Sequence, residues 1–350
     1  MTRPERPAAG RPTHRDVARL ARTSQATVSL VLNNRASALR ISEKTRDAVL
    51  AAARDLGYVP DLGARRLRHR LGTSTAPDLV LAVLRPASTR LGNATFVVEA
   101  AQAALAALPG GPTRSQLVLE EFLPGKLAEH PGVVGGARFH GAIVTGMTPE
   151  DERAFAAGPP SVPLVAFQRR APARAYVDVD NVRGGALATR HLVERGRRRI
   201  AALGYARPPS RAQEDRLEGY RQTLAAAGLG AAAGVWRAET ADPAPAAAAT
   251  DRLLREGRPD AIFVLSDVLA VGVLHALRAA GVGVPGEVAV VGYDDFPYAP
   301  FLDPPLSSVR LPYEAMGRAA VGWLTAAARA QAPGLLQEVY APELIVRRSS

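Results

Sequence analysis

Apolar and polar positions between residues 16 and 34 follow helical spacing in two short blocks that a polar turn separates. Each block carries one apolar stripe, formed by Val17, Leu20 and Ala21 in the first and by Val28, Val31 and Leu32 in the second. Because both stripes have the i, i+3, i+4 spacing of an α-helix, the pattern predicts two short helices that pack against each other. The outward face of the second helix is mostly polar and has no carboxylate, which is typical of the recognition helix of a helix-turn-helix.

The residues that follow predict a third helix, a short basic segment and a linker. Ser42 is a suitable N-cap for a helix over residues 43–56, and Gly57 ends that helix. Asp61 can cap a fourth helix over residues 62–68, in which arginines surround Leu67. These arginines are Arg65, Arg66, Arg68 and Arg70. Residues 72–77 have the composition of a linker.

From Leu79 onward, short apolar runs alternate with alanine-rich helical segments. We expect strands at 79–84, 117–119, 142–145, 164–167, 200–203, 261–265 and 288–291. We expect helices near 93–108, 181–195, 214–227, 246–256 and 267–280. Short buried strands that alternate with helices indicate parallel sheets with right-handed crossovers. The length of this region favours an α/β body of two doubly wound lobes, with a ligand bound between them beyond the carboxyl ends of the strands.

The charge of the chain is concentrated at its amino-terminal end. Residues 1–72 carry 15 Lys and Arg against 6 Asp and Glu, so nearly all of the net charge of +11 lies in one fifth of the sequence. This asymmetry indicates a nucleic-acid-binding head on a near-neutral body. The absence of cysteine excludes disulfides and thiol chemistry. Residues 1–12 lack the apolar core of a secretion signal, so we expect a disordered basic arm on a cytoplasmic protein with no membrane partner.

Many short motifs in order make the chain resemble the LacI/GalR family of bacterial transcription regulators, over residues 13 to about 347. In the head these motifs include Ser-x-x-Thr-Val-Ser at 24–29, Ser-x-x-Thr-Arg at 42–46 and Leu-Gly-Tyr-x-Pro at 56–60. In the body they include Asp-Asn at 180–181, Arg-x-x-Gly-Tyr at 216–220, Asp-x-x-Ala-x-Gly at 267–272 and Val-Val-Gly-Tyr-Asp-Asp at 290–295. The resemblance implies a helix-turn-helix head and a periplasmic-binding-protein-like body.

The resemblance also implies which residues contact DNA. Gln25, Ala26 and Leu30 fall where family members contact base edges, and Thr27, Ser29 and Asn33 fall where they hold phosphates. A Gln side chain can pair with adenine, and small or apolar side chains can pack on thymine methyl groups. Leu30 departs from the arginine of many relatives, and the alternative is that it covers a neighbouring helix.

Two further positions of the head bear on DNA binding. In the family, a leucine at the position of Leu67 wedges into the minor groove, here flanked by Arg65 and Arg68. The alternative is that Leu67 belongs to the core of a small helix. Arg22 lies at a turn position often filled by glycine, so a turn with positive φ would cost about 1 kcal/mol there.

For the body, the resemblance implies an effector site formed by Arg216, Asp294, Asp267 and Gln168. An arginine fork and a carboxylate each bind two adjacent hydroxyl groups, which suits a sugar or a related polar metabolite. Asp267 could instead be only the N-cap of the helix that follows it. Asp295 is interpreted as a loop or cap residue, and Asp180 as the N-cap of the helix that carries His191.

We therefore expect a homodimeric repressor that binds a palindromic operator in double-stranded DNA and responds to a small-molecule effector. The alternative is a two-lobe binding protein without a regulatory DNA role. No Gly-x-Ser-x-Gly elbow, phosphate-binding loop or metal spacing of histidines occurs, which argues against an enzyme, a metal site or a cofactor. The expected domains are the arm (1–12), the helix-turn-helix (13–60), a hinge helix and linker (61–77) and an effector-binding and dimerisation domain (78–347). Within the last, we expect one lobe at about 78–178 plus 296–324 and the other at about 179–295 plus 325–347.

Overall fold

The computed structural model describes most of the chain in twelve segments. They are residues 13–32, 41–56, 79–88, 91–109, 114–135, 138–157, 160–171, 174–207, 211–230, 234–329, 331 and 333–350. The predicted basic arm, the helix expected at 62–68 and the linker at 72–77 lie outside these residues.

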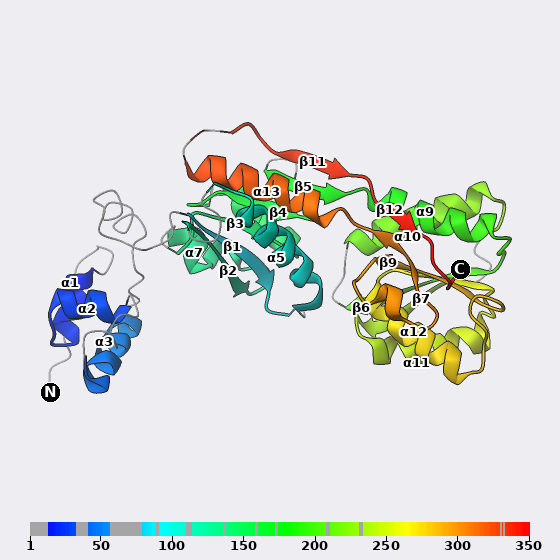
Figure 1. Ribbon diagram of the computed structural model, residues 1–350, viewed down its shortest axis with the longest axis horizontal. Coiled ribbons are helices and arrows are strands. Elements are labelled where there is room, and N and C mark those ends of the chain that lie inside the picture. Colours follow the sequence, from blue (N-terminus) through cyan, green and yellow to red (C-terminus); the bar gives the residue numbers. More distant parts are fainter. Residues whose placement is uncertain are drawn as a thin grey trace.

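The head contains the three predicted helices, α1 (His14–Leu20), α2 (Gln25–Leu32) and α3 (Glu43–Asp55), shown in blue in Figure 1. Its core is small and made of short apolar side chains: Val17, Ala18, Val28, Val31, Val49, Ala52 and Ala53. The prediction that Leu20 belongs to this core is wrong, since 46% of its surface is exposed. Leu20 ends α1, and the contact with α2 and α3 goes through Val17 and Ala18 instead.

Side-chain caps explain where these helices begin. Thr13 caps α1 in a reciprocal arrangement with Asp16, in which each residue bonds the backbone N–H of the other. The Ser24 hydroxyl accepts the Thr27 N–H at 3.0 Å, so Ser24 caps α2. Ser42 accepts the Thr45 N–H at 3.2 Å, which confirms it as the predicted cap of α3.

The first lobe of the body is a six-stranded parallel sheet with helices on both faces. Its strand order is β11-β5-β4-β3-β1-β2. The strands are β1 (Leu79–Pro86), β2 (Ser115–Phe122), β3 (Gly141–Val144), β4 (Leu164–Phe167), β5 (Ala175–Val179) and β11 (Gln337–Tyr340). The helices are α5 (Leu91–Ala106), η2 (Leu127–Glu129), α7 (Pro131–Gly135), α8 (Pro149–Ala157) and α13 (Tyr313–Ala328). Every residue of β1, β3 and β4 is buried, as their apolar runs predict.

The second lobe repeats this architecture with the order β12-β10-β9-β8-β6-β7, and only β12 runs antiparallel to its neighbour. The strands are β6 (Ile200–Arg207), β7 (Val235–Thr240), β8 (Ala261–Val264), β9 (Ala289–Asp294), β10 (Ser307–Arg310) and β12 (Glu343–Ile345). The helices are α9 (Asn181–Glu194), α10 (Arg211–Ala226), α11 (Pro243–Glu256), α12 (Asp267–Ala279) and η3 (Ala299–Phe301). Both sheets together confirm the predicted α/β class.

The lobe boundaries differ from those expected. Strand β10, assigned from the sequence to the first lobe, pairs with β9 in the second sheet, while β11, assigned to the second lobe, pairs with β5 in the first. The chain therefore crosses between the sheets three times, after β5, after β10 and after β11. These strands are short, and β10 begins with two buried serines, so they lack the apolar run that predicts the inner strands.

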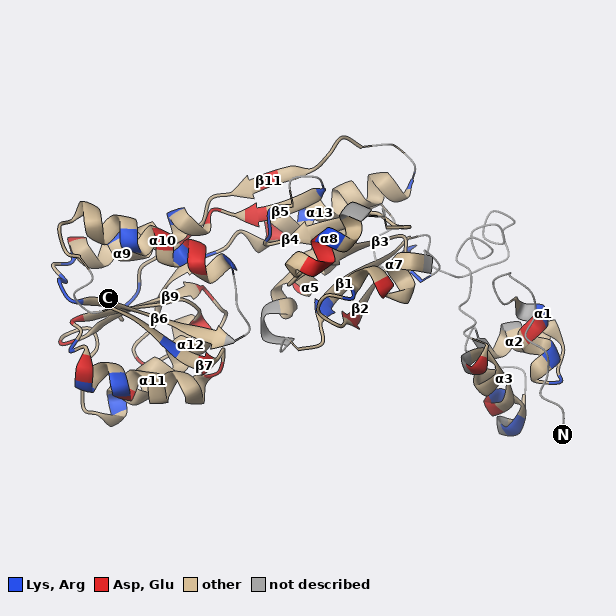
Figure 2. Cartoon of the chain, turned by 180° about the vertical axis from the view of Figure 1, so that it is seen from behind, with Lys and Arg blue, Asp and Glu red and all other residues tan. Residues whose placement is uncertain are grey.

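One hydrophobic cluster continues from the first sheet to the second, through α5 and α13 on one side and α9 and α10 on the other. Positions of basic and acidic residues alternate along the elements of both lobes (Figure 2). Among the helices of the described residues, none is long and apolar enough to cross a membrane.

Candidate functional site

The exposed face of α2 holds the residues predicted to contact bases. Gln25 and Ala26 are exposed and Leu30 is half-buried, while Val28 on the opposite face is fully buried. The helix has no charged residue, so nothing on it repels a phosphate. The Thr27 hydroxyl lies 2.9 Å from that of Ser24 and is part of the cap of the helix. The backbone of Ser29 is helical, and Asn33, Arg65, Leu67 and Arg68 lie outside the described residues.

The turn between α1 and α2 has the geometry considered for Arg22. Its φ is +50°, in the left-handed region that favours glycine. The side chain of Arg22 is exposed, so its burial does not offset this strain.

In the body, Arg216 of α10 is the centre of a buried polar group beside the crossover from β5 to α9. Its Nε donates to Asn181 Oδ1 at 3.0 Å, and its two terminal nitrogens donate to the Leu265 carbonyl at 2.5 Å and to Asp294 Oδ1 at 3.4 Å. The guanidinium also lies over the Tyr293 ring, 3.7 Å from its centre. These contacts use three of the five N–H donors of the side chain.

Two glycines bring α10 close enough to α9 for this arrangement. A Cβ at Gly185 would lie 2.0 Å from the backbone oxygen of Arg216, and one at Gly219 would lie 1.9 Å from that of Val182. Any other residue at either position would push the helices apart and move Arg216 away from Asn181.

Asp294, at the carboxyl end of β9, pairs with Arg216 and also accepts the Ser266 hydroxyl at 2.8 Å. Both Arg216 and Asp294 are only 6% exposed. Burial raises the pKa of Asp294, while Arg216 and Ser266 act in the opposite direction. Burial alone would lower the pKa of Arg216, but Asp294 and three nearby tyrosines together outweigh this effect, so the pKa of Arg216 is raised. Mutual pairing thus keeps two charges in a place that neither would occupy alone.

Asp267 is not a helix cap, which corrects one of the two interpretations of this residue. Ser266 holds the N-cap position of α12, and the Asp267 carboxylate points away from the helix end. Its oxygens accept the Ser308 hydroxyl at 2.7 Å and the Phe296 N–H at 2.9 Å. The side chain is fully buried, and burial together with the nearby Asp294 raises its pKa to about 8. Asp267 therefore supports the loop after β9.

Gln168 comes from the other lobe and lies at the end of β4. Its Nε2 donates to the Tyr313 hydroxyl at 3.1 Å, and Tyr313 begins α13 at the second crossover. The rings of Phe167 and Tyr313 are nearly parallel, with centres 6.3 Å apart. Gln168 thus lies beside the crossover, where the first lobe meets the group around Arg216.

An aromatic contact joins the two lobes at the same place, and the sequence did not reveal it. Phe96 of α5 stacks on Phe296, which follows β9, with ring centres 4.5 Å apart, and on Tyr313 at 5.3 Å. Tyr298 meets Phe296 edge to face at 5.4 Å. These residues are far apart in the sequence. The sequence offers little sign of their contact beyond the places of Phe296, after a predicted strand, and Tyr313, at a crossing between the lobes.

Asp178 is a further residue near this site that the sequence did not single out. It lies on β5 between Val177, whose carbonyl accepts the Gln168 N–H, and Val179, whose carbonyl accepts from Asn181. One carboxylate oxygen pairs with Arg170 at 3.3 Å, and the other is buried without a hydrogen-bond partner among the described residues. Burial raises the pKa of Asp178.

Backbone strain gathers around these residues. Of the five non-glycine residues with positive φ in the described part of the chain, three are Gln168 (+57°), Asp294 (+106°) and Asp295 (+51°). Such conformations cost about 1–3 kcal/mol each and persist where the surrounding contacts enforce them. The structure brings Gln168, Arg216 and Asp294 to the region where the lobes meet, with Asp267 one layer behind Asp294.

The chain is similar to known bacterial regulators over most of its length. Residues 13–61 match the model of the bacterial regulatory proteins of the lacI family, and residues 189–350 match a periplasmic binding protein-like domain. The chain is 35% identical to the HTH-type transcriptional regulator CelR of Thermobifida fusca, over 88% of this chain and 89% of that protein. It is 32% identical to the HTH-type transcriptional regulator MalR of Streptomyces coelicolor (strain ATCC BAA-471 / A3(2) / M145), over 96% and 95%. A solved structure of a CelR–cellobiose complex superposes with a TM-score of 0.67 at 32% identity, covering 97% of this chain and all of that one.

Proposed function

Because this chain belongs to the lacI family of bacterial regulatory proteins, we propose that its site around Arg216 and Asp294 binds the small molecule that controls its attachment to DNA. The protein is a DNA-binding transcriptional regulator and not an enzyme. The matched head over residues 13–61 argues against a two-lobe binding protein without a DNA role.

The effector is a sugar, and the buried Arg216–Asp294 pair is the observation that carries this proposal. Two of the five guanidinium N–H groups of Arg216 are not used by its contacts within the described residues, and both Asp294 oxygens keep acceptor capacity. A donor fork beside a carboxylate recognises neighbouring hydroxyl groups. The half-buried rings of Phe96 and Tyr313 supply flat apolar faces on which the C–H face of a sugar ring can stack, and the buried Phe296 supports Phe96 from behind. The relative CelR was solved with cellobiose, which makes cellobiose the first ligand to test.

Calorimetric titration of the full chain with cellobiose tests this proposal, with maltose, galactose and ribose as comparisons. The Gln168→Ala variant removes a polar group of the site and is expected to weaken binding at least tenfold. The matched control is Gln222→Ala, since Gln222 is exposed on α10 and contacts only Glu218 among the described residues. The absence of binding by all four sugars, or equal affinity of Gln168→Ala and wild type, would refute a sugar site here.

The head attaches to DNA through α2 and the basic segment that follows the helices. Gln25, Ala26 and Leu30 contact base edges, which the exposure of Gln25 and Ala26 on an uncharged helix supports. Thr27, Ser29 and Asn33 hold the phosphates on either side. With the Ser24 hydroxyl as the donor in its contact with Thr27, the Thr27 O–H is left to donate to a phosphate at the N-terminus of the helix.

Leu67, between Arg65 and Arg68, inserts into the minor groove of the operator. Replacement of Leu67 with Ala is expected to weaken operator binding at least tenfold and to leave the unfolding midpoint of the body unchanged. An operator selected from a random DNA pool allows the gel-shift titration, and equal affinities would exclude the wedge.

The regulator acts as a homodimeric repressor on a palindromic operator, because two identical heads present the same recognition helix to two half-sites. Chromosomal DNA is its target, so its place of action is the bacterial cytoplasm. Sedimentation equilibrium of the protein, measured alone and with operator, tests the dimer, and a monomer at micromolar concentration in both samples would contradict it.

A further inference from the structure

Two successive aspartates at the end of β9 have separate sets of partners. Asp294, the last residue of the strand, bonds Arg216 and Ser266 in the effector site, whereas Asp295, the first residue after it, bonds Arg310 and Arg347. Both residues have positive φ, so the loop holds this shape only because its surroundings fix it.

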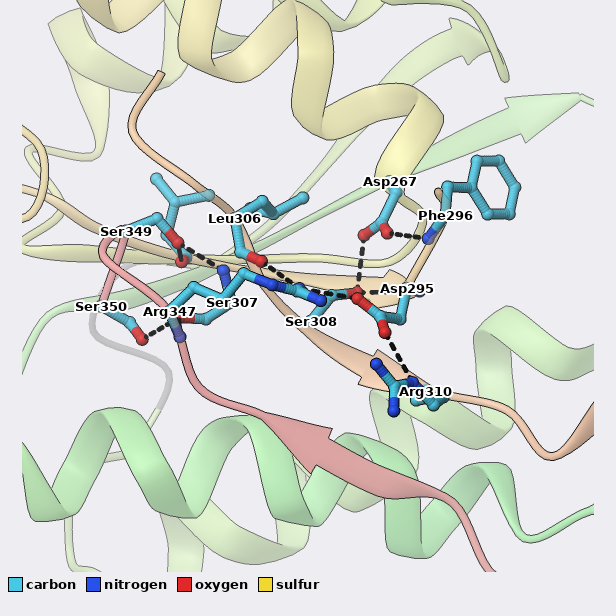
Figure 3. Close-up of polar contacts among 11 residues, drawn as sticks. Asp267, Asp295, Phe296, Leu306, Ser307, Ser308, Arg310, Arg347, Ser349 and Ser350 are labelled. Carbon is cyan, nitrogen blue, oxygen red and sulfur yellow. Dashed lines mark hydrogen bonds and ion pairs between the residues drawn. The ribbon is translucent and has the colours of Figure 1, made fainter. Parts of the chain in front are cut away.

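An ion-pair clamp grips the Asp295 carboxylate, which is 3% exposed. Oδ2 lies 2.7 Å from Arg310 Nε, and Oδ1 lies 2.6 Å from a terminal nitrogen of Arg347 (Figure 3). The Arg310 side chain is half-exposed, but that of Arg347 is only 15% exposed. Arg347 therefore supplies the buried half of the clamp, where an ion pair is screened least.

Arg347 is itself fixed from both ends. Its guanidinium also donates to the Leu306 carbonyl at 2.6 Å, and its backbone N–H donates to the Ser307 hydroxyl at 2.8 Å. Two residues further on, Ser349 exchanges backbone and side-chain bonds with Val290 of β9 at 2.7 and 2.6 Å. Residues 347–350 thus lie against β9 and β10 as part of the lobe (Figure 3).

The backbone of the same loop is held through a second route. The Asp295 N–H donates to the Ser308 hydroxyl at 3.1 Å, and that hydroxyl donates to Asp267 at 2.7 Å. Asp267 in turn accepts the N–H of Phe296 at 2.9 Å. Side-chain and backbone contacts therefore converge on three consecutive residues, of which the first and last belong to the effector site.

The clamp also reaches the contact between the lobes. Phe296 follows Asp295 directly and stacks on Phe96 of the first lobe. Arg310 is the last residue of β10, three positions before Tyr313, which stacks on the same ring. A shift of Asp295 would thus move both aromatic side chains that meet Phe96.

We propose that Arg347, acting through Asp295, is a positioning residue of the effector site, and that residues 347–350 form a brace for the loop that carries Asp294 and Phe296. This role of Arg347 rests on the proposed function, in which the loop binds the effector. The contacts of the brace hold the strained backbone of Asp294 and Asp295, so that Asp294 stays turned toward Arg216. The affinity for the effector therefore depends on a segment that does not touch the ligand.

Hydrogen–deuterium exchange of the full chain, resolved by peptide, tests the brace without a ligand. In the Arg347→Met variant the peptide covering residues 292–301 should exchange at least tenfold faster, while peptides from β6 and β8 exchange as in wild type. Arg347→Lys keeps one ion pair with Asp295 and should restore most of the protection. The matched control is Arg348→Met, because Arg348 is the exposed neighbour, and it should leave exchange unchanged.

The outcomes separate the brace from a purely structural role. Unchanged exchange at 292–301, or faster exchange throughout the second lobe, would overturn the proposal. Where wild type binds cellobiose, Arg347→Met should weaken that binding at least tenfold and Arg348→Met should not, and equal affinities would also overturn it. If wild type binds none of the four sugars but exchange rises only at 292–301, the brace stands and the sugar proposal fails. Should Arg347→Met not fold, Asp295→Asn removes the charge that both arginines hold and carries the same expectations.

Discussion

The Arg216–Asp294 pair allows a quantitative test of how the proposed effector site is built. Replacement of Arg216 with Met keeps a long apolar stem but leaves the Asp294 carboxylate buried, with the Ser266 hydroxyl as its one remaining partner among the described residues. Removal of one member of a buried ion pair destabilises a protein by about 3–5 kcal/mol. For a body of this size, that corresponds to a fall in the unfolding midpoint of roughly 10 °C.

A second substitution distinguishes the unpaired charge from lost packing. Asp294→Asn in the Arg216→Met background removes the stranded charge while keeping the shape and the bond to Ser266, so we expect it to recover about 2 kcal/mol or more. The Leu265 carbonyl still lacks its donor, so recovery stays incomplete. Urea unfolding of the two single variants, the double variant and wild type gives the coupling energy directly.

The pH dependence supplies an independent check. Burial raises the pKa of Asp294 in the wild type, and loss of Arg216 raises that pKa further. A carboxyl group whose pKa is higher in the folded state binds its proton more tightly there, so the deficit of Arg216→Met should shrink as pH falls from 8 to 5. A loss below about 1 kcal/mol, a double variant no more stable than Arg216→Met, or a deficit independent of pH would refute the reasoning.

Three further predictions concern the head and the loop after β9. Arg22→Gly relieves a positive φ and should stabilise the head by about 0.5–1 kcal/mol, because the relief of about 1–2 kcal/mol exceeds the entropy cost of glycine. Slower amide exchange in α1 and α2 measures this gain in stability, and unchanged or faster exchange contradicts it. The raised pKa of Asp267, about 8, means that the free energy of unfolding falls as pH rises from about 4 to 8, by up to about 5 kcal/mol. Asp267→Asn should remove most of that fall in urea titrations, and parallel pH profiles of variant and wild type would exclude the titration of Asp267. Operator affinity should fall steeply with salt, with a slope of about −4 or steeper in a plot of log K against log salt if five phosphates are contacted; a flat plot would contradict the phosphate contacts.

Sequence patterns predicted the elements whose residues pack on one continuous face. The helices of the head and the inner strands β1, β4, β6 and β8 carry runs or stripes of apolar residues that hardly depend on the rest of the fold. The edge strands lack such runs. Strand β11 is mostly exposed, and β12 has only three residues, so their pairing is decided by the sheets that they join.

The site was predictable in part, for a related reason. Arg216 and Asp294 could be named because each lies in a recognisable motif, and the structure brings them to 3.4 Å. Phe96 and Phe296 could not, because an aromatic residue has the same apolar signature in a core as in a ligand site. Asp178 is similar, since the sequence cannot show that one of its oxygens is buried without a partner among the described residues.

The crossings of the chain give the proposed effector site a route by which it can sense the arrangement of both lobes. Asn181, which holds Arg216, begins the helix after the first crossing, and Tyr313, which holds Gln168, begins the helix after the second. A ligand that bonds Arg216 and Gln168 together therefore acts on two of the three connections between the sheets, and it can shift the lobe arrangement only by binding one arrangement more tightly. The stack of Phe96 on Phe296 is the contact that such a shift must keep or break. An apolar contact of this kind tolerates sliding, whereas the hydrogen bonds on either side of it do not. We therefore expect the hydrogen bonds of Arg216 and Gln168, rather than the ring stack, to decide which lobe arrangement a ligand favours.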